Sequence, residues 1–101
     1  MTDLAFETLA DSLLATLEEA LGDHADAELQ GGVLNIDADG GTWVINKHAP
    51  TQQIWLSSPK SGARHYALDR VSGQWKDTRE GPDLLALLSA ELGVSLDEHQ
   101  R

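Results

Sequence analysis

Apolar residues recur with helical spacing in the first part of the chain. On a helical wheel they occupy an arc of about 140°, at positions Phe6, Leu9, Ala10, Leu13, Leu14, Leu17, Ala20 and Leu21. One broad apolar face of this kind predicts an amphipathic helix over residues 3–22. Thr2 or Asp3 can cap its start, and Gly22 can end it in the left-handed conformation.

The middle of the chain changes to a period of two residues, which is typical of strands. Leu34 and Ile36 alternate with Asn35 and Asp37. Similar short segments, separated by Gly-Gly, Ala-Pro and Ser-Gly pairs, predict strands at 27–30, 33–39, 42–47, 52–57, 64–68 and 74–76. Their short connections favour an antiparallel meander.

A second helix is expected to begin at Gly81-Pro82-Asp83, to present a leucine-rich side, and to end at Gly93. The order is therefore one helix, five or six strands and one helix. Two terminal helices that both need burial most simply cover the same face of the sheet. We predict a single α+β domain over residues 1–101, a two-layer sandwich whose other sheet face meets water.

Composition and charge narrow the range of functions. The 101 residues contain no cysteine, which excludes disulfides and thiolate chemistry on this chain. The net charge of −10 makes nucleic acid and anionic membranes poor partners. No apolar run approaches the ~20 residues that a membrane-spanning helix needs. Asp3 and Glu7 stand where a targeting peptide would carry Lys or Arg, so we expect a cytoplasmic protein, with a processed organellar chain as the alternative.

Acidic residues are concentrated in the first half of the chain. Residues 1–46 hold ten Asp and Glu and no Lys or Arg. In the first helix, Asp3, Glu7, Asp11 and Glu18 fall within about 80° of the wheel, with Glu19 further round. We call this row of carboxylates the acidic ridge.

Carboxylates spaced in this way repel one another by a few tenths of a kcal/mol per pair. The ridge therefore favours a counter-charge, and oxygen ligands suit hard cations such as iron, manganese, magnesium or calcium. A solvated face of an acidic protein is the alternative. In either case Asp11→Lys and Glu18→Lys are expected to be neutral or stabilising.

A tryptophan on the third long strand is the second candidate feature. Alternation places Gln53, Trp55 and Ser57 opposite Ile54 and Leu56, whose apolar face must be the core. Trp55 is then exposed, either as an anchor for a partner or lying flat across neighbouring strands.

The same alternation directs two more polar residues outward. Asn46 points away from Trp43 and Ile45, and His65 points away from Tyr66. Trp75 lies near the end of its predicted strand, so alternation does not decide whether its side chain is in the core or on the surface. The four histidines are scattered singly and are expected to be surface residues.

Two segments resemble the frataxin family. Residues 41–62 (GTWVINKHAPTQQIWLSSPKSG), with Arg64-His65-Tyr66 after them and Gly32-Val33-Leu34 before them, resemble its signature segment. The acidic first helix looks like that of the bacterial, CyaY-like members. The resemblance implies a frataxin-like α–β sandwich and a non-catalytic role in iron–sulfur cluster assembly, with weakly bound iron and docking on a cysteine desulfurase and an iron–sulfur scaffold protein.

The resemblance also implies two sets of site residues. The iron-linked positions correspond to Asp3, Glu7, Asp11, Glu18, Glu19, Asp23, Asp26 and Glu28. The docking positions on the sheet surface correspond to Asn46, Gln53 and Trp55, and more loosely to Arg64 and His65. Gly22 stands where many members carry a further acid, and the tail after Gly93 is short.

Two alternatives remain open from the sequence. One is a ferroxidase or iron-storage protein, against which the lack of any Glu-x-x-His pair argues. The other is a metal-independent interaction module whose ridge meets a basic partner. We expect a monomer, with iron-dependent oligomers as an open alternative.

Overall fold

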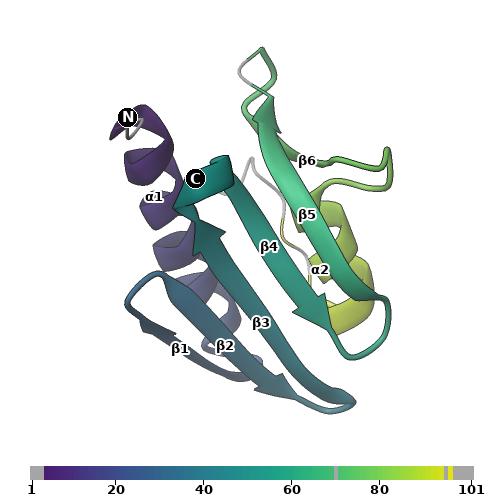
Figure 1. Ribbon diagram of the computed structural model, residues 1–101. Helices are drawn as coiled ribbons and strands as arrows, with labels where there is room; N and C mark the ends of the chain where they lie inside the picture. Colours follow the sequence, from purple (N-terminus) through teal and green to yellow (C-terminus); the bar gives the residue numbers. More distant parts are fainter. Residues whose placement is uncertain (1–3, 70, 95, 97–101) are drawn as a thin grey trace.

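Six antiparallel strands form one sheet in which every strand pairs with its neighbours in the sequence (Figure 1). The computed structural model describes residues 4–69, 71–94 and 96. The elements are α1 (Leu4–Leu21), β1 (Asp26–Gln30), β2 (Val33–Ala38), β3 (Gly41–His48), a short 3₁₀ helix η1 (Ala49–Thr51), β4 (Gln53–Ser58), β5 (Gly62–Asp69), β6 (Gln74–Asp77) and α2 (Leu84–Leu92).

Both helices lie behind the sheet in the view of Figure 1, on one face of it. α1 packs on β1, β2 and β3, whereas α2 packs beside β6. The predicted α+β sandwich and its meander are therefore confirmed, and no helix or strand among the described residues covers the second sheet face. No helix in the described part of the chain has both the length and the apolar character that crossing a bilayer requires.

The core is a single apolar layer between the sheet and the helices. The sheet contributes alternate residues of its strands, namely Leu34, Ile36, Trp43, Ile45, Ile54, Leu56, Tyr66 and Trp75. The helices contribute Phe6, Ala10, Leu14, Leu17, Leu21, Leu84, Leu87 and Leu88, and Leu96 lies after them. Trp75 is only 7% exposed and meets the Phe6 ring edge-on, with the ring centres 5.9 Å apart. Trp75 is thus a core residue.

The buried stripe of α1 is narrower than the apolar arc predicts. Leu9 is 44% exposed and Ala20 is also exposed, because both lie at the end of the arc farthest from β1. Gly22 does not adopt the expected left-handed conformation: its N–H continues the helical pattern to the carbonyl oxygen of Glu18, at 3.0 Å. Gly93 does end α2 at a φ of 70°. The proposed caps Thr2 and Asp3 lie outside the described residues.

A two-residue turn sets the pairing of the first hairpin. Gly31 and Gly32 both have positive φ, as the tight turn between two twisted strands requires. Gln30 therefore faces Val33, and the same register places Asp26 opposite Asp37. The strand after η1 begins at Gln53, one residue later than predicted, because Gln52 takes a left-handed conformation at the end of the 3₁₀ turn.

A carboxylate on α2 joins this helix to the sheet. One oxygen of Glu91 accepts hydrogen bonds from the Trp43 indole N–H at 2.9 Å and from the Ser58 hydroxyl at 2.6 Å. The Ser58 oxygen in turn accepts two backbone N–H groups of the β4–β5 turn. Burial alone would raise the pKa of Glu91, but the hydrogen bonds from Ser58 and Trp43 outweigh it and lower that pKa.

Glu91→Ala is expected to lower the free energy of unfolding by about 1–3 kcal/mol, because the buried indole N–H of Trp43 loses its acceptor. Glu91→Gln, which keeps an oxygen acceptor, should lose less. Because the pKa of Glu91 is lowered by folding, its stabilisation is full above pH 4.5 and fades as the pH falls below that value. Thermal unfolding at pH 7 and pH 3.5 checks this: the difference in stability between wild type and Glu91→Ala should be smaller at pH 3.5. A larger difference at pH 3.5 would contradict the prediction.

Candidate functional site

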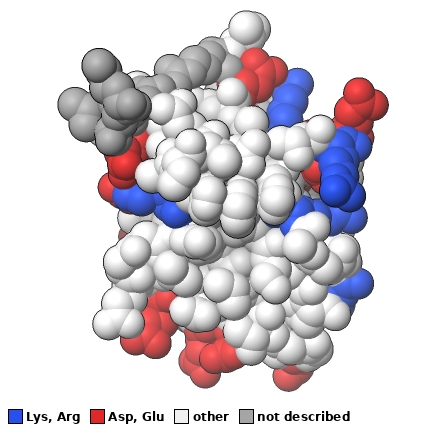
Figure 2. All heavy atoms as spheres, in the orientation of Figure 1, with Lys and Arg blue, Asp and Glu red and all other residues white. Residues whose placement is uncertain are grey.

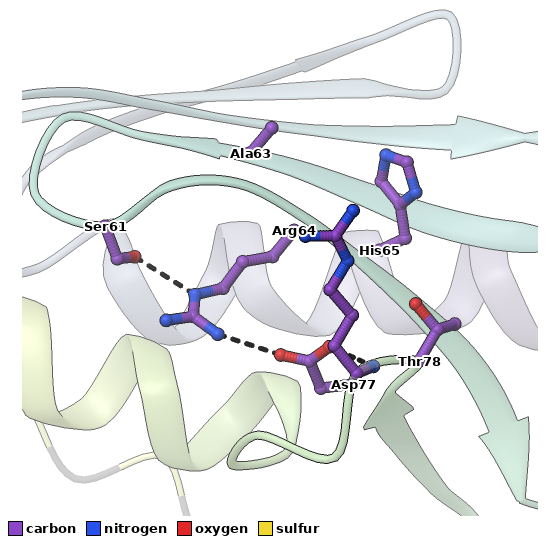
Figure 3. Close-up of a pocket in the computed structure, with 7 residues that line it drawn as sticks. Ser61, Ala63, Arg64, His65, Asp77 and Thr78 are labelled. Atoms are coloured by element: carbon purple, nitrogen blue, oxygen red, sulfur yellow. Dashed lines mark hydrogen bonds and ion pairs between the residues drawn. The ribbon is translucent and has the colours of Figure 1, made fainter.

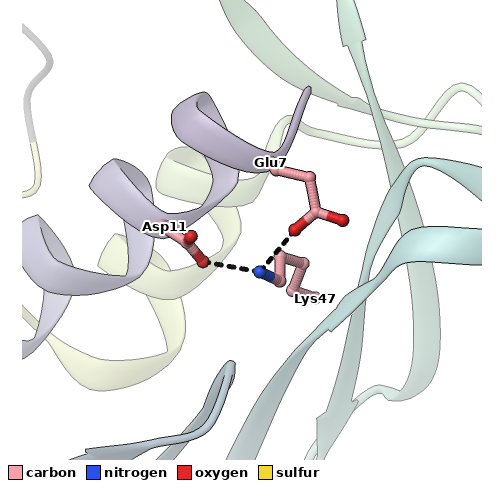
Figure 4. A network of polar contacts seen from close by, with 3 residues as sticks. All are labelled: Glu7, Asp11 and Lys47. Carbon is pink, nitrogen blue, oxygen red and sulfur yellow. Dashed lines mark hydrogen bonds and ion pairs between the residues drawn. The ribbon is translucent and has the colours of Figure 1, made fainter. Parts of the chain in front are cut away.

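The first half of the acidic ridge already has a cation. The Lys47 ammonium lies 2.7 Å from the carboxylate of Glu7 and 2.8 Å from that of Asp11 (Figure 4). Hydrogen bonds from Lys47 to Asp11 and Glu7 raise the pKa of the lysine. Lys47 reaches α1 because it shares the strand parity of Trp43 and Ile45 and so points to the helix side of β3. The expectation of a ridge without a basic neighbour is therefore wrong at this end.

Glu18 binds the backbone of the edge strand. One of its carboxylate oxygens accepts the backbone N–H of Leu29 at 3.1 Å. β1 is the first strand of the sheet, so this N–H lies on an edge that no other strand covers. A charged helix side chain over an edge blocks pairing with foreign strands. The expectation that Glu18→Lys is neutral or stabilising assumed that Glu18 has no partner in the protein. This assumption is wrong, because the substitution removes the bond to Leu29.

The remaining acids are exposed and lie on two sides of the β1 edge. Glu19 and Asp23 belong to α1 and the turn after it, and no hydrogen bond or ion pair joins the side chain of either to another described residue. Asp26 and Glu28 alternate with the half-buried Ala27 and point to the opposite sheet face from α1. Asp3 lies outside the described residues. The sequence-derived set is thus divided by the sheet into separate groups.

The hairpin adds an acid that the sequence analysis did not select. Asp37 is the register partner of Asp26, and its carboxylate accepts the hydroxyl of Thr42. Two carboxylates directly opposite each other repel, so this pair is a place where a cation is favoured. The Gly31-Gly32 turn could have given this pairing from sequence alone. Among the described residues, no group of three or more His, Asp or Glu side chains comes together as a metal site.

Trp55 lies on the uncovered face of the sheet between two histidine rings. The ring of His48 stacks on one side, with centres 3.6 Å apart and planes 9° apart. His65 stacks on the other side at 4.3 Å and 14°. The indole N–H donates to the amide oxygen of Gln53 at 2.8 Å, which orients the ring. The tryptophan is therefore half-buried and held in place by neighbours from three strands.

The face around Trp55 carries no charged side chain on β3, β4 or β5 until Asp69. Asn46 lies directly opposite Trp55 in the register, and His48 lies opposite Gln53. In Figure 2 the centre of this face is free of charged groups, while the Asp, Glu, Lys and Arg atoms lie around its rim. We call Asn46, His48, Gln53, Trp55 and His65 the sheet-face cluster. In a chain with ten excess negative charges, an uncharged aromatic face is distinctive.

Arg64 does not share this face, contrary to its grouping with His65. It has the parity of Tyr66, and its guanidinium lies 2.8 Å from the carboxylate of Asp77. His48, in contrast, belongs to the cluster although the sequence analysis treated it as a scattered surface histidine. Its parity with Asn46, followed by a turn back into Gln53, was the available signal.

Comparison with known proteins identifies the family of this chain. A model of the frataxin-like domain matches residues 1–98. The chain belongs to the frataxin-like family. The iron–sulfur cluster assembly protein CyaY of Paraburkholderia phymatum is 39% identical to this frataxin-like chain over 94 residues, which cover 88% of the chain and 86% of that protein.

Two longer relatives are similar as well. A mitochondrial frataxin-like protein of Leishmania donovani is 41% identical, and the mitochondrial frataxin homologue of Schizosaccharomyces pombe is 38% identical, each over 90% of this chain. The chain spans 54% of the length of the first protein and 63% of the second.

Solved structures agree with the fold. A frataxin of Psychromonas ingrahamii, from the CyaY protein family, superposes with a TM-score of 0.80 at 28% identity over 96% of this chain and 97% of that one. Trimeric frataxin of Saccharomyces cerevisiae complexed with ferrous iron gives a TM-score of 0.70 at 38% identity, covering 87% of this chain and 81% of that one.

The ion pairs of Lys47 lead to a stability prediction. Asp11→Lys should lower the free energy of unfolding by about 0.5–1 kcal/mol, because it replaces a partner of Lys47 by a like charge. Glu19→Lys is the matched control: it makes the same charge change on the same helix, at a residue without such a partner. It should be neutral or slightly stabilising. Chemical denaturation of both variants at low salt checks this, and equal stability of the two would show that the Lys47 pairs contribute nothing.

Proposed function

We propose that this chain is an iron-binding, non-catalytic regulator of iron–sulfur cluster assembly that docks on a complex of cysteine desulfurase and scaffold protein. Membership of the frataxin-like family carries the proposal, together with the name of the 39%-identical relative, an iron–sulfur cluster assembly protein. Two surfaces of this chain support it. The acids around α1 and β1 suit a hard cation, and the sheet-face cluster suits a protein partner.

Iron binding is assigned to the free end of the acidic set. Glu7 and Asp11 must release Lys47 before they can bind a cation. Glu19 and Asp23 on the helix side are exposed, and so is Asp26, which lies on the other sheet face opposite Asp37 and forms a second group. Ferrous iron is bound in the crystal of the yeast frataxin, to which this chain is 38% identical. Carboxylates on an exposed helix and strand give few ligands in a loose geometry, so the proposed binding is weak and reversible.

Docking is assigned to the sheet-face cluster. Aromatic side chains dominate the binding energy of protein interfaces, and depletion of charge is typical of their centres. The Trp55 ring is already ordered by His48, His65 and Gln53, so little conformational entropy is lost when a partner covers it. The acidic groups at the rim would attract a basic partner and orient its approach.

Titration with Fe(II) under anaerobic conditions is expected to perturb the amide signals of Glu19, Asp23 and Asp26 first, and those of Glu7 and Asp11 less. Lys47→Met frees two carboxylates, so it should extend the perturbation to Glu7 and Asp11 and strengthen binding several-fold. Lys76→Met, which removes the same charge far along the sheet, serves as the control. Perturbation confined to the histidines, with both variants like wild type, would contradict the assignment.

Trp55→Ala is expected to weaken binding to the desulfurase–scaffold complex by about 2 kcal/mol or more, as a central aromatic anchor does. Its fold should persist, because the ring lies on the wet face and truncation of a core tryptophan would cost about 3–5 kcal/mol. Ser57→Ala, on the same strand and face, is the matched control. Binding by calorimetry and melting are measured on the same samples. Unchanged affinity in a folded Trp55→Ala protein would overturn the docking assignment.

A further inference from the structure

A cavity of about 390 Å³ opens at the edge of the sheet where β5 continues past the end of β6 (Figure 3). It is lined by Ser61, Ala63, Arg64, His65, Asp77, Thr78 and Arg79. Arg64 and His65 lie on opposite faces of β5, so the cavity wraps around the strand edge and meets both sides of the sheet. The acidic ridge does not use it, and it shares only His65 with the sheet-face cluster to which docking is assigned.

Asp77 lines this cavity, and each of its two carboxylate oxygens already has a partner within the protein. Its side chain is 3% exposed, and one oxygen binds the Arg64 guanidinium at 2.8 Å. The other oxygen accepts the backbone N–H of Arg79, also at 2.8 Å. The Nε of Arg64 donates to the Ser61 hydroxyl at 3.2 Å. Arg64 is thus held by two partners, and both oxygens of the single carboxylate in the lining are hydrogen-bonded within the protein.

The groups left over in the lining are hydrogen-bond donors. Arg64 has five N–H donors, and its two contacts leave the remaining ones unused. The guanidinium of Arg79 has no ion pair with any described residue. Two guanidinium groups against one carboxylate give the lining an excess positive charge, in a chain whose net charge is −10. Thr78 adds a hydroxyl.

The strand edge adds backbone groups. β6 pairs only with Tyr66–Asp69 of β5. The last hydrogen bond along this pair runs from the Thr78 N–H to the carbonyl oxygen of His65, at 2.9 Å. Polar groups of every second residue of a strand point to the same edge, so those of Ala63 point the same way as those of His65. No strand of the described chain pairs with Ala63 on that side.

From this arrangement we propose that the cavity binds a small molecule through its carboxylate or phosphate group. A held guanidinium, a second guanidinium and a hydroxyl form the donor set that these oxyanions prefer. The volume exceeds that of a single oxyanion and falls in the range of small-molecule sites. The site is distinct from the carboxylates assigned to iron, and its ligand is of opposite charge.

The cavity also borders the sheet-face cluster. His65 lines its rim and stacks on Trp55 on the other side, with ring centres 4.3 Å apart. An anion bound beside this ring stack changes the electrostatic field at the indole, and the indole emission responds to that field. Occupancy of the cavity should therefore be visible in the fluorescence of Trp55.

The test uses the full chain without metal, titrated with citrate and, separately, with inorganic phosphate at constant ionic strength. Amide signals of residues 61–65 and 77–79 are followed together with tryptophan emission. Arg79→Gln keeps the backbone bond to Asp77 and should weaken binding about tenfold or more. Lys76→Gln removes the same charge from the neighbouring strand outside the lining and should change the affinity less than twofold. Which probe binds more tightly identifies the oxyanion.

Three results would overturn the proposal. The first is a lack of saturable shifts in residues 61–65 and 77–79 with either probe at 20 mM. The second is an equal loss of affinity in Arg79→Gln and Lys76→Gln, since this would show a response to net charge alone. The third is an emission change that persists in Trp55→Phe, because the signal would then come from the buried Trp43 or Trp75. Thr78→Val is a second test variant. It removes the hydroxyl from the lining without changing the charge, and it should weaken binding of the anion several-fold.

Discussion

A sheet covered by helices on one face only gives each strand residue one of two environments, and neighbouring residues receive opposite ones. On β3 this rule directs Lys47 beneath α1, while Asn46 and His48 face water. On β5 it sends Arg64 toward Asp77 and His65 toward Trp55. A one-residue slip would exchange all of these positions at once. The ion pairs, the aromatic stack and the cavity therefore depend on one register.

Charge is distributed unevenly around this sheet. Glu18, Glu19 and Asp23 lie along α1 and its turn, on the β1 side. Four of the basic side chains come later, at Lys60, Arg64, Lys76 and Arg79, around β5 and β6. Figure 2 shows Lys and Arg atoms along the right rim of the sheet face, over the β5 and β6 side. The β1 edge is thus mainly acidic, whereas the β5–β6 side carries basic residues together with Asp69, Asp77 and Glu80. A charged partner therefore meets a directional field instead of a uniform one.

The fold was predictable because it depends on local patterns. Alternation gave the strands and the core tryptophan Trp43, and Gly93 ends α2 as predicted. The start of α2 lies later than predicted, at Leu84, with Asp83 as its N-cap and Pro82 before the helix. The errors came from contacts between distant segments. A helical wheel of α1 contains no information on Lys47, because this residue lies on β3, about forty residues later in the sequence. In the same way, the wheel separates Glu18 from Glu19, but it does not show that Glu18 lies against the backbone of the edge strand.

The purely sequential strand order has a consequence for the way the chain is made. Each strand pairs only with strands adjacent in the sequence, so the sheet grows in the direction of synthesis, one hairpin at a time. α1 leaves the ribosome before the sheet, yet the surface that buries it needs β1, β2 and β3 and also Trp75 of β6, which meets Phe6. Its leucine-rich stripe is therefore fully covered only after the last strand has been made, and transiently exposed apolar surface is prone to aggregation. The carboxylates beside the stripe are then useful before the protein is folded, because they keep nascent chains apart.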